Sequence, residues 1–277
     1  DGRNCIRFFT QSMQEQVQKR LSLSTELRNA IKNGEFWLAY QPILDLNTGR
    51  ILKAESLLRW EHPQLGNIPT SEFIPIAEES GLISDIGNWV FNKAAKQTSQ
   101  WLSSLSPDFQ ISVNMSPAQF RGEQTNHEHW LAYLDGIDLK AKHIVIEITE
   151  GLLMDMNSQV MAQLNSFDAA GIEISIDDFG TGYSSLSYLK KFHIDYLKID
   201  QSFVQNLAPD SDNMALCEAI IVLAHKLGLK VIAEGIETQI QKDLLTSVNC
   251  DYGQGYLFSQ PMPAAEFERY VKATQNK

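Results

Sequence analysis

The residues of this chain that could carry out chemistry are polar side chains that lie in, or directly after, hydrophobic segments resembling β-strands. Four of them are carboxylates, one is an amide and one is an amine. They come from six segments far apart in the sequence: Glu55, Asn114, Glu147, Asp177, Lys198 and Glu234. Carboxylate and amide oxygens form a hard ligand set, which suits Mg²⁺ or Mn²⁺ better than zinc. Buried carboxylates this close together also need cations to stay ionised.

The adjacent pair Asp177 and Asp178 could serve two metal ions from one strand end. Two metals about 4 Å apart activate a water and stabilise both the attacking and the leaving oxygen of an in-line phosphodiester displacement. A single carboxylate at a strand end is more often a helix cap or a surface charge, and Asp-Asp-Phe-Gly is often only a turn. Lys198 alone could be solvated or ion-paired. The metal interpretation therefore depends on the agreement of all six segments.

The segment Asp177–Leu186 is longer than a turn requires and carries two glycines and several hydroxyl groups. Glycines allow tight backbone excursions, and hydroxyls with exposed N–H groups could meet a phosphate or a metal-bound water. Composition alone leaves a mobile lid and a rigid cap on the barrel as equal alternatives.

Strand-like and helix-like segments alternate through most of the chain, which predicts an α/β fold, a TIM-like (β/α)8 barrel. In such a barrel the strand ends meet at one rim, where the six polar residues would converge. The expected strands are Phe36–Ile43, Ile51–Trp60, Phe109–Met115, His143–Thr149, Ile172–Asp178, Tyr196–Asp200, Lys230–Glu234 and Gly255–Phe258. The expected helices include Thr25–Lys32, Ser84–Leu105, Ser158–Ala170, Met214–Leu227, Gln239–Val248 and Ala264–Ala273.

The first connection departs from this alternation. Only Leu44–Arg50 joins the first two expected strands, whereas a parallel crossover needs about a dozen residues. The sequence therefore predicts an antiparallel first strand that turns near Asn47–Gly49. Within the second strand, Glu55 shares a face with Leu57 and Arg59, and Ser56 lies on the opposite face, toward the helices.

Composition narrows the function classes. The 277 residues carry a net charge of −11, which argues against binding a nucleic acid polymer, because that needs basic patches. No apolar run reaches the roughly 18 residues of a membrane span, and the first twenty residues do not resemble a signal peptide. Three cysteines without paired spacing predict a reduced, cytoplasmic domain. Membrane attachment of a longer parent protein stays open.

Eight ordered motifs resemble the EAL domain family. The naming motif corresponds to Glu55–Trp60, in which Ser56 replaces the usual Ala. The others are Tyr40–Ile43, Asn114–Ser116, Glu147–Glu150, Asp177–Leu186, Lys198–Asp200, Ala233–Glu237 and Gln254–Tyr256. The resemblance covers roughly residues 25–272 and implies a phosphodiesterase that linearises cyclic di-GMP to pGpG with two Mg²⁺ or Mn²⁺ ions. A receptor that binds cyclic di-GMP without cleaving it is the alternative, which a missing ligand or lysine would favour.

The resemblance also implies roles for individual residues. One metal would be held by Glu55, Asn114, Glu147 and Asp177, and a second by Asp177, Asp178 and Glu234. Lys198 would hold or deprotonate the attacking water, with Glu55 and Glu234 as further catalytic groups. Glu150 would anchor the Asp177–Leu186 loop, and Glu237 would support the metal side. Substrate contacts would come from Gln41, Leu57, Arg59, Asp200 and Gln254.

The first residues resemble a different domain. Asp1–Asn4 and Ile6–Phe9 look like the end of a GGDEF (diguanylate cyclase-like) domain, and residues 10–24 look like a linker helix. We therefore expect residues 1–24 to be the tail of a preceding domain and residues 25–277 to be the barrel. EAL domains commonly dimerise through the region after the Asp177–Leu186 loop, which implies a homodimer.

Overall fold

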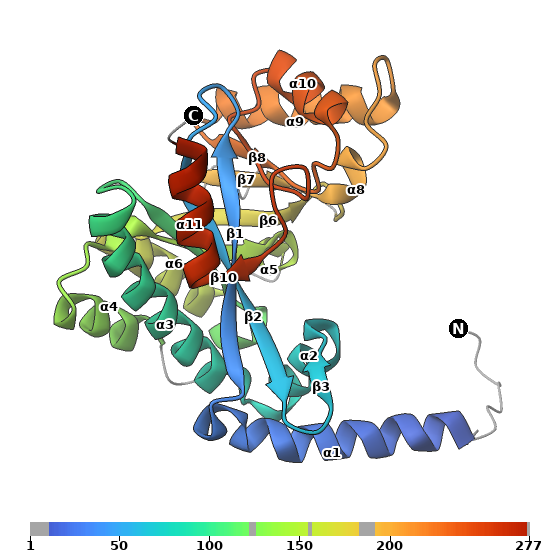
Figure 1. Cartoon of the computed structure of the whole chain (residues 1–277), viewed down its shortest axis with the longest axis vertical. Helices are drawn as coiled ribbons and strands as arrows, with labels where there is room; N and C mark the ends of the chain where they lie inside the picture. Colours follow the sequence, from blue (N-terminus) through green and yellow to red (C-terminus); the bar gives the residue numbers. More distant parts are fainter. Residues whose placement is uncertain (1–10, 122–125, 155–156, 183–191, 276–277) are drawn as a thin grey trace.

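A closed barrel of eight strands forms the centre of the structure, a computed structural model that describes residues 11–121, 126–154, 157–182 and 192–275 (Figure 1). Its strands are β1 (Phe36–Asp45), β2 (Ile51–His62), β4 (Gln110–Asn114), β5 (Ile144–Thr149), β6 (Glu173–Phe179), β7 (Tyr196–Ile199), β8 (Lys230–Ala233) and β9 (Tyr252–Gly253). Each pairs with the next, and β1 closes the ring by pairing with both β2 and β9. Short strands β3 (Gly66–Ile68) and β10 (Met262–Pro263) extend it. The predicted barrel is confirmed.

The antiparallel start of the barrel is also confirmed. β1 runs antiparallel to β2 and to β9, whereas β2 and β4 to β9 are parallel neighbours. The turn between β1 and β2 begins at Asp45, whose Oδ1 accepts hydrogen bonds from the backbone N–H groups of Asn47 and Thr48 at 3.0 and 2.8 Å. Gly49 ends it with a φ of 71°, a conformation that glycine adopts without steric cost.

Helices surround the barrel and bury its outer face (Figure 1). Tyr40 of β1, for example, packs against Trp101 and Phe267, with ring centroids 4.8 and 6.3 Å apart. None of the helices among the described residues is both long and apolar enough to cross a bilayer. The helices are α1 (Gln11–Asn33), α2 (Thr70–Ser80), α3 (Ile83–Ser104), α4 (Asn126–Gly136), α5 (Glu150–Met154), α6 (Ser158–Ala170), α8 (Gln201–Val204), α9 (Asp212–Lys226), α10 (Gln239–Ser247) and α11 (Ala264–Gln275), with 3₁₀ turns at Pro117–Phe120 and Ala141–His143.

The expected linker and the expected first helix are one continuous helix, α1, which projects from the barrel toward the N-terminus (Figure 1). Leu23, Leu27 and Ala30 are buried, and α1 contacts α2. No break marks the expected boundary between residues 24 and 25, because the sequence there holds no Gly or Pro to end the helix. The segment that resembles a GGDEF tail, residues 1–9, lies outside the described residues.

The last strand differs from its prediction. β9 is Tyr252–Gly253, and residues 255–258 form a turn instead of the expected strand Gly255–Phe258. The backbone N–H of Leu257 bonds to the Ile236 carbonyl at 2.9 Å, and those of Phe258 and Ser259 bond back to Gly255 at 3.1 and 3.2 Å. The apolar residues after Gly255 therefore cap the barrel end rather than extend its wall.

Candidate active site

One polar side chain from each barrel strand, or from the residue directly after it, points into the same end of the barrel. Strand register explains the convergence: Gln41 pairs with Glu55 across β1 and β2, and Asn114 pairs with Glu147 across β4 and β5. After β8 and β9 the ladder continues through the N–H of Glu234 to the Ile199 carbonyl (3.1 Å) and of Gln254 to the Ala233 carbonyl (2.8 Å). All six residues that the sequence singled out meet here: Glu55, Asn114, Glu147, Asp177, Lys198 and Glu234.

Lys198 lies at the centre of this cluster and is only 1% exposed. Its ammonium nitrogen is 2.7 Å from carboxylate oxygens of both Glu147 and Glu234. The carboxylates of Asp177 and Glu55 lie slightly further away, at 3.3 and 3.6 Å. Four carboxylates therefore share one buried cation, which leaves the cluster with an excess of negative charge.

This excess and the burial shift the acid–base equilibria of the cluster. Burial lowers the pKa of Lys198, but the four carboxylates outweigh it and raise that pKa well above its ordinary value. Burial raises the pKa of Glu147 well above its ordinary value and that of Glu234 to about 7, in spite of Lys198. Burial also acts to raise the pKa of Glu55, but Lys198 and hydrogen bonds from two side-chain amides lower it overall. Added cations would relieve the repulsion among these carboxylates.

Two amide side chains fix the orientation of Glu55, and a third supports one of them. Asn114 donates from Nδ2 to Oε1 of Glu55 at 2.7 Å, and Gln254 donates from Nε2 to Oε2 at 2.7 Å. Gln254 also donates to Oε1 of Gln41 at 2.9 Å, and Gln41 donates to the Ser259 carbonyl at 3.2 Å. Both oxygens of Glu55 are thus held by neighbours on different strands.

The residues of the cluster fit divalent cations. Within the described residues, Oε1 of Glu147 and Oε1 of Gln254 are buried and have no hydrogen-bond partner, so each keeps lone pairs available to a ligand. Carboxylate oxygens of Asp177, Asp178 and Glu234 lie within 4.8 Å of one another. Asp178 holds a φ of 55°, an uncommon backbone conformation for a residue other than glycine. All these donors are oxygens, the preference of Mg²⁺ and Mn²⁺.

The described part of the Asp177–Leu186 loop packs against Glu150. Oε2 of Glu150 accepts a hydrogen bond from the Gly180 N–H at 2.9 Å. A Cβ on Gly182 would lie 3.0 Å from Oε1 of the same carboxylate, so glycine allows the close approach. Glu150 therefore contacts the described part of the loop, and its anchoring role stays a prediction; residues 183–186 of the loop lie outside the described part of the chain.

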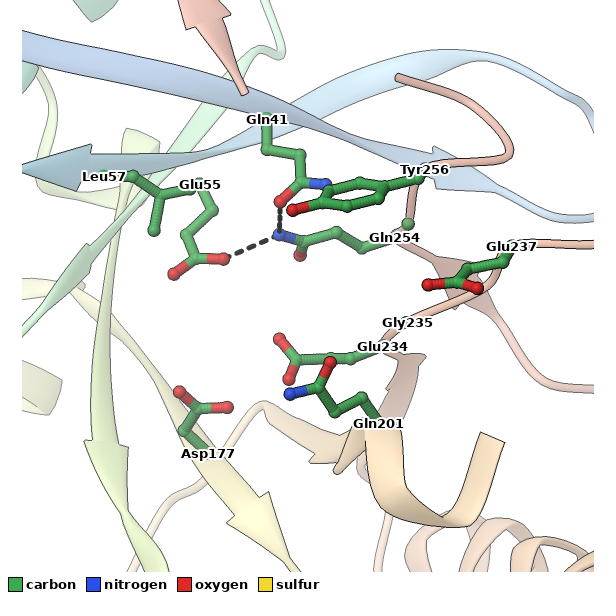
Figure 2. Close-up of a pocket in the computed structure, with 11 residues that line it drawn as sticks. Gln41, Glu55, Leu57, Asp177, Gln201, Glu234, Gly235, Glu237, Gln254 and Tyr256 are labelled. Carbon is green, nitrogen blue, oxygen red and sulfur yellow. Dashed lines mark hydrogen bonds between the residues drawn. The ribbon is translucent and has the colours of Figure 1, made fainter. Parts of the chain in front are cut away.

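The cluster opens into a cavity of about 290 Å³ (Figure 2). Four of its residues were given no role from the sequence: Gln201, Gly235, Gly255 and Tyr256. Each lies within two residues of one that was, so position beside a strand end was the available signal. The full lining is Gln41, Glu55, Leu57, Asp177, Gln201, Glu234, Gly235, Glu237, Gln254, Gly255 and Tyr256.

Other expected site residues lie around this cavity. Leu57 lines it and also a neighbouring, more apolar cavity of about 310 Å³, which Arg59 and Asn114 line as well. The Arg59 guanidinium donates to the Leu58 carbonyl at 2.9 Å. Asp200 is not among the lining residues; its carboxylate caps α8 by accepting from the Ser202 N–H at 3.0 Å. Glu237 lines the cavity on the side away from Asp177 (Figure 2).

Ser56 faces the helix layer, as strand alternation predicted. It lines the apolar cavity together with α3 residues such as Val90, and it is 2% exposed. Its hydroxyl donates to the Ser112 carbonyl at 2.7 Å. The Ser56 side chain therefore lies on the outer face of the barrel.

Comparisons of the chain with a family model and with known proteins point to the same family. The model of the EAL domain matches residues 24–261. The chain is 42% identical over 265 residues to the bifunctional diguanylate cyclase/cyclic di-GMP phosphodiesterase MucR of Pseudomonas aeruginosa, covering 96% of the chain and 38% of that protein. It is 36% identical over 272 residues to the cyclic di-GMP phosphodiesterase NbdA of the same organism, covering 98% of the chain and 35% of that protein.

Similar solved structures belong to the same family. The phosphodiesterase PaMucR in complex with c-di-GMP superposes with a TM-score of 0.84 at 41% identity, over 89% of this chain and 99% of that one. The EAL enzyme Bd1971, bound to cAMP and cyclic di-GMP, gives a TM-score of 0.87 at 36% identity, over 95% of this chain and 70% of that one. The chain spans little more than a third of the length of the curated relatives above.

Proposed function

This chain belongs to the EAL domain family, and on that premise we propose that it hydrolyses cyclic di-GMP to linear pGpG with the help of two divalent cations. The observation that carries the proposal is the cage of four carboxylates around Lys198 at one end of the barrel. Every oxygen ligand that the family resemblance implies is present, and so is the lysine. A receptor without hydrolytic activity would not need all of them.

We assign the ligands as the family resemblance implies. Glu55, Asn114, Glu147 and Asp177 would hold one Mg²⁺ or Mn²⁺ ion. The second ion would be held by Asp177, Asp178 and Glu234, whose oxygens lie within 4.8 Å of one another. When bound, such ions lower the pKa of water and offset the negative charge that develops on a phosphodiester in its transition state.

Lys198 acts by holding the attacking water with its ammonium group. This group already donates toward oxygens of Glu147 and Glu234, so a water beside those carboxylates lies within its reach. Without metal ions the four carboxylates raise the pKa of Lys198, which favours the charged amine that would hold the water; cations bound to those carboxylates would lower that pKa again. Glu55 and Glu234, on two sides of the same amine, remain the carboxylates that can take part in proton transfer.

The remaining residues position the substrate. Gln41 and Gln254 keep Glu55 oriented through their shared hydrogen bonds, and both line the cavity with Leu57. Arg59 supplies a cation near Asn114 for a phosphate of the substrate. Asp200 acts indirectly, by fixing the start of α8 beside the cavity. Glu237 supports the cavity wall opposite Asp177.

The decisive experiment is to incubate the purified protein with cyclic di-GMP and Mg²⁺ or Mn²⁺ and to separate the products by chromatography. We expect pGpG to form in the presence of either metal and not in a chelator. Binding of cyclic di-GMP in the presence of metal without any product, by the monomer and by an enforced dimer, would establish the receptor alternative instead.

We further propose that the chain is the cytoplasmic, catalytic part of a longer protein and works as a homodimer beside a GGDEF-like domain. The relatives above are about three times longer than the aligned segment, and α1 projects toward the N-terminus as a connecting helix would (Figure 1). Light scattering on the purified protein tests the dimer. A monomer at all concentrations, with full activity, would contradict it.

A further inference from the structure

One wall of the cavity carries a side-chain amide to which neither the sequence motifs nor the family resemblance gives a role. Gln201 is the first residue of α8 and lines the cavity together with Asp177 and Glu234. Figure 2 shows its amide pointing into the cavity beside Glu234, across from Gln41 and Gln254. Its side chain enters the active site from the position directly after Asp200, at the start of α8.

The backbone around Gln201 fixes where this side chain starts. Asp200 caps α8 and so holds the first turn of the helix. On the other side, Gly235 has a φ of 69°, and a Cβ there would lie 2.6 Å from the Cβ of Gln201. The loop after β8 can therefore pack directly against Gln201 because residue 235 has no side chain. The Cβ of Gln201 thus faces Gly235, and the amide at the end of the side chain lies in the cavity.

Within the described part of the chain, the Gln201 amide makes no hydrogen bond, although its neighbours do. The amide nitrogen of Gln41 donates to the Ser259 carbonyl, and that of Gln254 donates to Gln41 and to Glu55. Asp177 and Glu234 are carboxylates, which repel an anion unless a cation lies between. Gln201 is thus a neutral donor in this wall, and its amide does not itself repel a phosphate oxygen.

We propose that Gln201 is a substrate-binding residue that donates a hydrogen bond from Nε2 to a non-bridging oxygen of the scissile phosphodiester. The proposal rests on the proposed function, because the phosphate must lie next to the cations that Asp177 and Glu234 hold. The amide would share the phosphate oxygens with those cations and fix the orientation of the diester.

The test compares Gln201→Met, which keeps the length of the side chain and removes the donor, with Gln205→Met. Gln205 is exposed, lies one turn further on, and does not line the cavity. Hydrogen bonds to charged groups contribute enough that kcat/KM should fall by about 10- to 100-fold in Gln201→Met. The control should stay within about twofold of wild type, and both variants should keep the wild-type melting temperature.

A second substrate separates phosphate contact from nucleoside contact. Bis(4-nitrophenyl) phosphate is a phosphodiester without guanosine, so Gln201→Met should lose the same factor on it. A loss confined to cyclic di-GMP, or no loss on either substrate, would overturn the assignment. So would a loss that saturating metal restores, because the amide oxygen would then be a metal ligand. A wild-type protein that cleaves neither substrate would instead refute the proposed function.

Discussion

The ammonium nitrogen of Lys198 lies 2.7 Å from a carboxylate oxygen of Glu147, and the two side chains are 1% and 0% exposed. Neither charge can be solvated by water at this depth, so each depends on the other and on the three further carboxylates around the lysine. The second oxygen of Glu147 is buried without a partner. This pair would therefore link the stability of the barrel to the occupancy of the proposed metal site.

Removal of a central ligand should abolish activity. Glu55→Ala or Asp177→Asn should reduce pGpG formation by at least about 1000-fold, because metal catalysis contributes several kcal/mol to such reactions. Glu61→Ala is the matched control for the first change, since Glu61 lies on the same strand and is exposed. Turnover near the wild-type level in either ligand variant, with metal still bound, would contradict the assignment of ligands.

Metal binding should stabilise the fold. Cations that bind only the native state add free energy of unfolding, about 2.7 kcal/mol when their concentration is 100 times Kd. We expect Mg²⁺ and Mn²⁺ to raise the melting temperature of the wild-type protein and a chelator to reverse the change. Asp177→Asn should respond much less, because Asp177 belongs to both proposed sites. Equal shifts in the two proteins would place the stabilising ion elsewhere.

Lys198→Ala should separate chemistry from binding. We expect the affinity for cyclic di-GMP to stay within about tenfold of wild type, roughly 1.4 kcal/mol, while most of kcat is lost. The change also leaves Glu147 buried without its partner, which should lower the free energy of unfolding in a chelator by about 3 to 5 kcal/mol. Affinity and turnover should therefore be measured at a saturating metal concentration. Lost binding with unchanged kcat would show that the lysine holds the substrate instead.

Ser56→Ala should leave catalysis unchanged. The hydroxyl bonds to the Ser112 carbonyl on the outer side of the barrel, so its loss should cost about 1 kcal/mol of stability. Turnover should stay within a few-fold of wild type, measured at a temperature well below the melting transition. A 100-fold loss, about 2.7 kcal/mol in the barrier, would mean that this side chain reaches the active site.

Gly255→Ala should disrupt the cavity beside Gln254. A Cβ at residue 255 would lie 2.1 Å from the Ile236 carbonyl oxygen and 2.3 Å from its nitrogen, and backbone atoms cannot move aside as a side chain can. We expect a loss of more than about 4 kcal/mol in stability, or a folded protein with displaced Gln254 and little activity. Gly136→Ala is the control, because open space surrounds that glycine. Wild-type stability and activity in Gly255→Ala would show that this turn is not constrained.

The sequence was sufficient for the architecture and for most of the cluster. Alternation of strand-like and helix-like segments predicted the barrel, and the seven-residue connection Leu44–Arg50 predicted the antiparallel pair. Because strand ends of a barrel meet at one rim, Glu55, Glu147 and Asp177 could be brought together without coordinates. These features depend on local periodicity and chain length, which are properties of the sequence itself.

The tertiary structure decided what depends on contacts between distant segments. The apolar run after Gly255 predicted a strand, but its hydrogen bonds to the loop at Ile236 make it a turn. The direction in which the pKa of Lys198 shifts could not be inferred from the sequence, because it follows from distances to four carboxylates on other strands. A Cβ on Gly235 would lie 2.6 Å from the Cβ of Gln201, and no local pattern encodes that contact between the loop after β8 and the start of α8. The burial of a side chain and the charge around it depend on all the residues that surround it, and only the folded chain determines which residues those are.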